Sequence, residues 1–141
     1  MASLLAGLVG GLIATIVMTV VMMMVGDGGP PPTARLVSKF AGGTPEDHAM
    51  PGMALHMVYG LGAGVVFALG VPLVGLGFGS LGLAIGLGLV YGVVLMIGGM
   101  MFWMRTVIGM EPDRGTMTTF AAAHVTYGVV LGAFLWMGVL A

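Results

Sequence analysis

Histidine and tyrosine are the side chains of this sequence best suited to chemistry, and they occur twice in one pattern. The stretch HMVYGLGAG begins at residue 56, and HVTYGVVLG begins at residue 124. The matched positions are His56, Tyr59, Gly60, Gly64, His124, Tyr127, Gly128 and Gly132. Because the chain has only 3 His and 3 Tyr, the match indicates an internal duplication. The spacing places each set of four on one face of a helix.

The two His–Tyr pairs are candidates for an intramembrane polar site. An imidazole can relay a proton near neutral pH, which would serve a small transporter or a proton-linked channel. Two facing histidines can also hold a haem iron or another metal. Alternatively, each histidine bonds to a nearby carbonyl or threonine and fixes helix packing. We prefer packing, because a neutral imidazole near the membrane interface costs little free energy.

Methionine offers a further kind of chemistry. The chain has 15 Met, and thioethers are soft ligands that select copper(I). Methionine is also a flexible apolar filler of helix interfaces, and this simpler role explains most of these residues. We therefore expect no metal site and no cofactor, with haem or copper as the alternatives.

The composition is that of a membrane protein. The 141 residues are 59% hydrophobic and 6% charged, whereas soluble domains carry about 25% charged residues. All charged side chains fall within residues 27–47 and 105–114. The chain has no cysteine, which excludes disulfides and thiolate chemistry. Its 4 dispersed Lys and Arg make no nucleic-acid-binding surface.

Four apolar segments have the length of a transmembrane helix, which needs about 20 residues. They cover residues 3–25, 51–70, 81–104 and 118–140. We expect an all-α fold, an integral-membrane four-helix bundle in a single transmembrane domain. It would consist of two helical hairpins, repeat 1 at residues 1–72 and repeat 2 at residues 80–141. Residues 34–40 predict a short amphipathic helix in the membrane interface.

Local signals predict where these helices begin. Thr33 has the side chain of an N-cap for the amphipathic helix, and one of Thr116, Thr118 or Thr119 would cap the last span. Pro51 predicts either a kink or a fresh helix start in the second span, because proline disrupts a helix interior.

Glycine lines the expected helix interfaces, because small residues let helices approach closely in a membrane. The positions that we expect to pack are Gly7, Gly11, Gly60, Gly64, Gly82, Gly86, Gly128 and Gly132. Gly88 and Gly92 form a further pair with the same spacing.

The basic residues predict the orientation in a cell membrane. All four lie in the two polar loops, residues 26–50 and 105–117, and none lies between the second and third spans. By the positive-inside rule, both loops face the cytoplasm and both termini lie outside. The two hairpins are then parallel repeats, related by an axis along the membrane normal.

An enzyme is not expected, because no carboxylate lies inside a span and no nucleotide loop or hydrolase triad is present. We expect a small polytopic membrane protein with a structural or accessory role, surrounded by lipid. The bundle has little interior room, so we also expect a homo-oligomer or a partner in a membrane complex.

The segment GLIATIVMT at residues 11–19, together with the repeated HxxYGxxxG motif, resembles a group of small uncharacterised four-span membrane proteins of archaea and bacteria. The resemblance implies the fold and membrane residence. It implies no activity and no assigned site.

Overall fold

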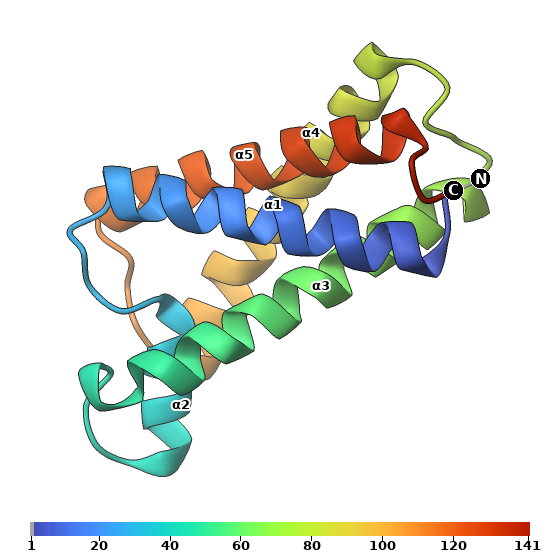
Figure 1. The fold of residues 1–141 in the computed structure, drawn as a ribbon. Helices are drawn as coiled ribbons and strands as arrows, with labels where there is room; N and C mark the ends of the chain where they lie inside the picture. The colour runs from blue at the N-terminus through green and yellow to red at the C-terminus, as the bar shows by residue number, and fades with distance from the viewer. Residues whose placement is uncertain (1) are drawn as a thin grey trace.

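The structure is a computed structural model, and it describes residues 2–141. The described chain is all-helical, with five α-helices and two shorter or irregular helical segments (Figure 1). In chain order these are α1 (Leu4–Val25), α2 (Pro32–Ala41), η1 (Glu46–His48), α3 (Ala49–Leu73), α4 (Leu81–Gly98), η2 (Gly99–Ile108) and α5 (Arg114–Met137). The prediction of an all-α fold is confirmed.

Four helical stretches are long and apolar enough to cross a membrane, as predicted. They are Leu4–Val25, Glu46–Leu73, Leu81–Ile108 and Arg114–Met137. Many of their large side chains are exposed, such as Val58 at 67% and Val90 at 65%. An apolar surface of this extent is stable in lipid, where it requires no contact with water.

The helix starts differ in detail from the sequence-based expectations. Helix α5 is capped by Asp113, whose carboxylate accepts a hydrogen bond from the Thr116 amide, so the prediction of a threonine cap is wrong. A carboxylate suits the positive end of the helix dipole, and it starts the helix at Arg114. Thr33 is not the cap of α2 either, because that helix already begins at Pro32.

A helix starts close to Pro51, as in the second of the two expectations, because α3 begins at Ala49. The proline stands in the first turn of the helix, where its missing N–H removes no internal hydrogen bond. The three residues that precede α3, Glu46–His48, form a short 3₁₀ helix that leads into it.

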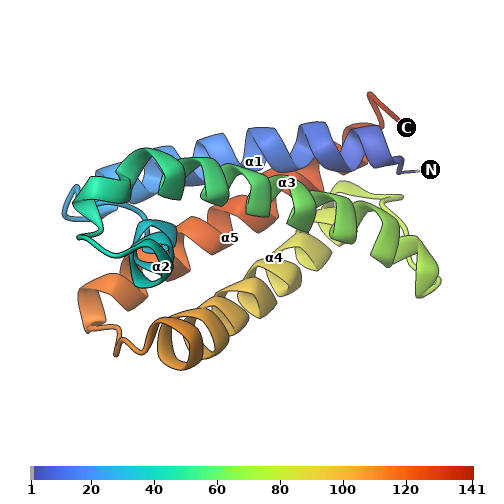
Figure 2. The same cartoon turned by 90° about the horizontal axis from the view of Figure 1, so that it is seen from below.

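The helices lie in the spatial order α3, α1, α5, α4. Helix α1 packs along both α3 and α5, and α5 packs along α4 (Figures 1 and 2). Helices α3 and α4 diverge toward the end that carries α2 (Figure 2). At mid-height Tyr91 of α4 bridges them: its hydroxyl donates to the Ala63 carbonyl at 2.7 Å, and its ring stacks on Phe67.

Glycine makes the closest helix contacts, as expected, in two places. In α1 and α3, Gly7 and Gly11 lie directly against Gly64, so a methyl group added to Gly64 would collide with the α1 backbone. In α4 and α5, Gly88 and Gly92 lie against Gly128 in the same way.

Gly82 and Gly86 do not take part in these contacts. Within residues 2–141, no heavy atom lies within 4 Å of the place where a Cβ would stand on either residue. The expectation that they pack within the chain is therefore wrong. Helix α4 turns Ala84, Gly88 and Gly92 toward α5 instead, and Gly82 and Gly86 lie on its opposite, outward side.

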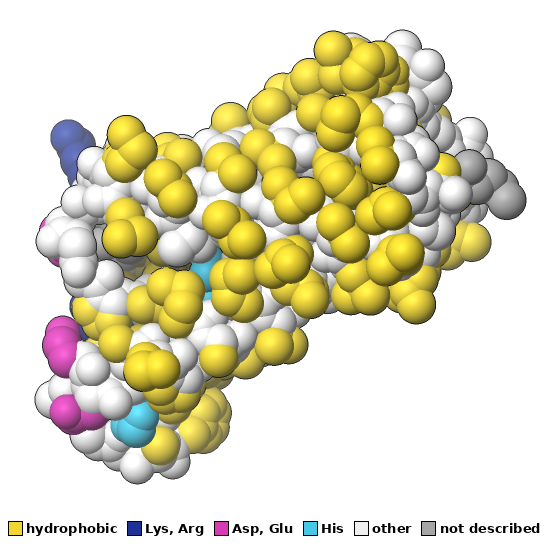
Figure 3. Space-filling view, viewed as in Figure 1, with side chains coloured by type: hydrophobic (Ala, Val, Ile, Leu, Met, Phe, Trp, Pro, Cys, Tyr) yellow, Lys and Arg dark blue, Asp and Glu magenta, His cyan; other side chains and the backbone are white. Residues whose placement is uncertain are grey.

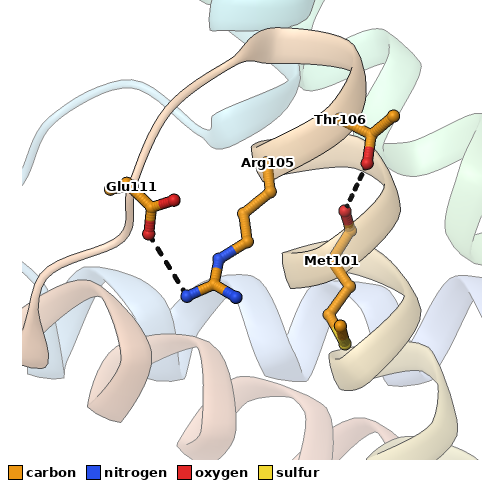
Figure 4. Close-up of polar contacts among 4 residues, drawn as sticks. All are labelled: Met101, Arg105, Thr106 and Glu111. Atoms are coloured by element: carbon orange, nitrogen blue, oxygen red, sulfur yellow. Dashed lines mark hydrogen bonds and ion pairs between the residues drawn. The ribbon is translucent and has the colours of Figure 1, made fainter.

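Segment η2 is a π-helix, where a continued α-helix was expected. Its backbone bonds join residues five apart, so Gly99 and Met104 share a face, as do Trp103 and Ile108. The Thr106 hydroxyl donates to the Met101 carbonyl five residues back, and the exposed Arg105–Glu111 ion pair closes the following loop (Figure 4). The Phe120 ring occupies the space in which a side chain on Gly99 would lie, so glycine fits at this position.

The polar loops gather at one end of the molecule, where the charged side chains lie (Figure 3). The described termini and the turn between α3 and α4 lie at the other end (Figure 1). There the Ser3 hydroxyl donates to the Leu140 carbonyl at 2.6 Å, which ties the start of α1 to the segment after α5.

Candidate functional site

The structure brings all four predicted site residues to one pocket of about 130 Å³. His56 and Tyr59 enter it from α3, and His124 and Tyr127 enter it from α5. The remaining wall is mostly apolar and comes from α1, α2, α4 and η2, together with further residues of α3 and α5. Its members include Met18, Met22, Leu36, Leu55, Ala63, Leu95, Trp103, Met104, Ile108 and Phe120.

His56 is held by a threonine of α1. Its Nε2 lies 3.1 Å from the Thr19 hydroxyl oxygen, and the Thr19 hydroxyl donates its own proton to the Thr15 carbonyl. The Thr19 oxygen therefore acts as the acceptor, which places the proton of a neutral imidazole on Nε2 of His56. Its Nδ1 then carries a lone pair and no proton.

His124 is held in the opposite tautomer. Its Nδ1 lies 2.8 Å from the Phe120 carbonyl, which can only accept, so Nδ1 carries the proton and Nε2 carries the lone pair. The residue is only 8% exposed. Among the described residues, no fully enclosed side-chain nitrogen or oxygen lacks a partner. Nε2 of His124 makes no hydrogen bond, so this atom opens into the pocket that the residue lines.

The two tyrosines differ from one another, although the sequence motif treats them alike. Tyr127 is 2% exposed, and its hydroxyl donates to the Gly60 carbonyl at 2.7 Å. Tyr59 is 43% exposed, and its ring meets Trp103 edge to face at a centroid distance of 6.4 Å. Tyr127 therefore closes the inner end of the pocket, while Tyr59 stands at its mouth.

Below the pocket the bundle is filled. Leu131 and Ala14 have no exposed surface, and Phe67 is 4% exposed. At the other end α2 covers the pocket with Pro32, Thr33 and Leu36. The cover is fixed where Ala34 lies against Gly52 and the Thr33 hydroxyl donates to the Gly52 carbonyl at 2.6 Å.

A shallow apolar groove continues from the mouth of the pocket, and we call it the α2 groove. It shares Leu36, Leu55 and Trp103 with the pocket. Its other members are Val37, Phe40, Ala41 and Val107. The Lys39 ammonium donates to the Ile108 carbonyl at 3.3 Å and joins its two walls.

Several residues at the site were not singled out from the sequence. Thr19 holds His56 from outside the pocket, and Trp103 lines the pocket wall. Phe120 carried no signal, because its role depends on the facing Gly99. The methionines that reach the pocket, Met18, Met22 and Met104, could not be separated by sequence from the other twelve.

Residues 2–141 contain no group of three or more histidine or acidic side chains placed to hold a metal ion. The Asp and Glu residues all belong to the polar loops or to helix starts. The described lining of the pocket therefore offers imidazole, phenol, thioether, hydroxyl and indole groups, and no charged side chain.

The fold defines a class: a small all-α protein with four helices that have the length and composition to span a membrane. The chain matches no protein-family model, and comparison with curated proteins and with solved structures finds no match. The resemblance to small four-span proteins of archaea and bacteria therefore stays a prediction.

Proposed function

We propose that this chain is a non-enzymatic accessory protein of the cell membrane, and that it binds a small lipid-soluble molecule between its helices. The observation that carries the proposal is the meeting of His56, Tyr59, His124 and Tyr127 in one otherwise apolar pocket. Binding sites for small molecules are typically mostly apolar, with a few polar groups that fix orientation.

Binding is better supported than a proton or substrate path through one copy. The pocket ends at Tyr127 and Ala63, and the fully buried Leu131 and Ala14 fill the bundle beyond them. A path needs polar groups or water along its length. The two histidines lie together at one end instead.

Copper binding is the second candidate. Met18, Met22 and Met104 line the same pocket as the two histidines, and thioether and imidazole ligands suit copper(I). The test is metal analysis of protein purified after copper exposure. Copper retained by the wild type and lost in His124→Asn would favour this candidate over an organic ligand. Haem is less well supported, because the pocket volume is far below that of a macrocycle.

The proposed orientation keeps residues 26–50 and 105–117 in the cytoplasm and both termini outside. Arg35 and Lys39 of α2, Arg105 of η2 and Arg114 at the start of α5 all belong to the end of the molecule that carries these loops (Figure 1), which supports it. We also propose that α2 lies in the membrane interface, since Phe40 is 76% exposed on a helix that carries Arg35 and Lys39.

The proposed duplication is supported by the two glycine contacts. Helix α1 packs closely against Gly60 and Gly64, and α4 packs in the same way against the equivalent Gly128 and Gly132. We further propose a homo-oligomer or a membrane-complex partner at the outward side of α4, where Gly82 and Gly86 leave room for a second helix.

Binding is tested with decylbenzene added to the purified protein in detergent. A ligand that binds only the folded state raises the unfolding midpoint. We expect this rise in the wild type and its loss in Leu55→Phe, which fills the mouth of the pocket. The matched control is Val58→Phe on the same helix, where the side chain is 67% exposed and outside the pocket. Equal midpoint shifts in both variants would contradict the proposed site.

A further inference from the structure

The size of the pocket limits its occupant to about one ring. Its volume is about 130 Å³, and an engineered apolar cavity of about 150 Å³ holds a benzene molecule. The rings of Tyr59, Trp103 and Phe120 stand around the space. Aromatic walls favour a flat aromatic ring over a branched aliphatic group of the same volume.

The two imidazoles that line the pocket select the functional group on that ring. Nε2 of His124 has no hydrogen bond to any residue that the structure describes, and it carries a lone pair, because the proton on Nδ1 is donated to the Phe120 carbonyl. His56 likewise keeps its Nδ1 lone pair, because Nε2 donates to Thr19. Both imidazoles therefore accept hydrogen bonds. A ligand that satisfies them must supply an O–H or N–H donor.

The α2 groove gives the rest of the ligand a place outside the pocket. It continues from the pocket through Leu36, Leu55 and Trp103 and runs over Val37 and Phe40. All of its lining residues are apolar. An unbranched hydrocarbon substituent on the ring would bury its surface there without leaving the lipid phase.

We infer that the pocket binds the hydroxylated ring of an alkyl-tailed phenol or hydroquinone, with its O–H donated to Nε2 of His124 and its tail in the α2 groove. This inference rests on the proposed binding function. It also distinguishes oxidation states: a hydroquinone carries the required donor, whereas the corresponding quinone carries only acceptors and leaves the His124 lone pair unsatisfied.

The test compares three ligands of one shape in the same detergent: para-decylphenol, para-decylanisole and decylbenzene. The anisole keeps the oxygen of the phenol and lacks its proton. Binding is followed by the emission of Trp103 in a Trp136→Phe background, because Trp136 lies outside the pocket. We expect the phenol to bind about 10-fold more tightly than the anisole, the effect of one hydrogen bond to a buried acceptor.

The variant His124→Asn locates the hydrogen bond. An asparagine amide nitrogen can still donate to the Phe120 carbonyl, but nothing replaces Nε2. We expect the ratio of phenol to anisole affinity to fall to about one. The wild-type ligand series needs no variant, so it decides the question even if His124→Asn fails to fold. Equal binding of phenol and anisole would overturn the phenol inference alone, whereas no binding of any of the three would overturn the proposed function as well.

Discussion

The hydroxyl of Tyr127 donates a hydrogen bond to the carbonyl oxygen of Gly60 at 2.7 Å, across 67 positions of sequence. It joins α5 to α3, two helices that otherwise meet through α1. Gly60 accepts this bond at the point where Thr15 of α1 also touches it. Three helices are therefore fixed to one another at a single residue, which itself lines the pocket.

Replacing Tyr127 with phenylalanine removes this bond and keeps the ring. We expect Tyr127→Phe to lower the free energy of unfolding by about 1 kcal/mol, the usual net effect of one buried hydrogen bond. Unfolding in mixed detergent measures it. Tyr59→Phe is the control, because the Tyr59 hydroxyl makes no hydrogen bond within the described chain. Equal losses in the two variants would contradict a specific role for the Tyr127 bond.

Gly60→Ala should destabilise the bundle by more than that. The added Cβ would overlap the Thr15 side chain, which has no exposed surface and lies between α1 and α3. Overpacking of this kind costs about 1–3 kcal/mol. The same unfolding assay gives the value.

The matched control for this change is Gly62→Ala on the same helix, where no heavy atom of the described chain lies within 4 Å of the new methyl group. It should leave stability unchanged or raise it by up to about 1 kcal/mol, because alanine favours the helix. If Gly62→Ala proves as harmful as Gly60→Ala, close packing at Thr15 is not the cause.

Asp113 should make the start of α5 sensitive to acid. The backbone hydrogen bond from Thr116 holds the pKa of this carboxylate below its usual value. A carboxylate with a lowered pKa in the folded state stabilises that state above its unfolded pKa, and the contribution is lost as the pH falls through the folded pKa. The unfolding midpoint of the wild type should therefore decline on acidification below the ordinary range of aspartate.

Asp113→Asn separates charge from capping in that experiment. Asparagine still caps a helix but does not titrate, so its midpoint should decline less steeply with acid than that of the wild type. A wild-type profile as shallow as that of the variant would show that Asp113 does not control this response.

Cysteine labelling tests the proposed orientation, because the chain has no cysteine of its own. A cysteine in place of Ser38, on α2, should react with a membrane-impermeant maleimide only after the cells are opened. A cysteine added after Ala141 should react in intact cells. The reverse pattern would invert the topology.

The outward glycines of α4 give a test of self-association. We expect Gly82→Leu with Gly86→Leu to reduce chemical cross-linking between copies in the membrane, because large side chains prevent close helix approach. Leu83→Ala is the control on the same helix, since it removes bulk and adds none. Unchanged cross-linking in the double variant would place any oligomer contact elsewhere.

The sequence was sufficient for the four apolar helices and for α2, because composition and periodicity act locally. It was also sufficient to choose the four His and Tyr residues that line the pocket. It could not assign their hydrogen-bond partners. The bond from Tyr127 to Gly60 joins α5 to α3, and it depends on the packing of α1 against both of these helices. The sequence does not show that packing.

Two other features could not be predicted from the sequence. The π-helix of η2 places Met104 on the same face as Gly99, and no residue pattern in that apolar segment distinguishes a π-helix from an α-helix. The glycine spacing in α4 fits two faces equally well, and only the packing partner decides between Gly82 with Gly86 and Gly88 with Gly92.

The divergence of α3 and α4 makes the bundle an open arc rather than a closed ring (Figure 2). The side chain of Tyr91 spans the opening at mid-height, and the pocket lies on the α2 side of it. Under the proposed binding function, a ligand dissolved in the bilayer would approach sideways from one leaflet, without crossing the headgroups. Its concentration within that leaflet, rather than in the surrounding water, would then set how often the pocket is filled.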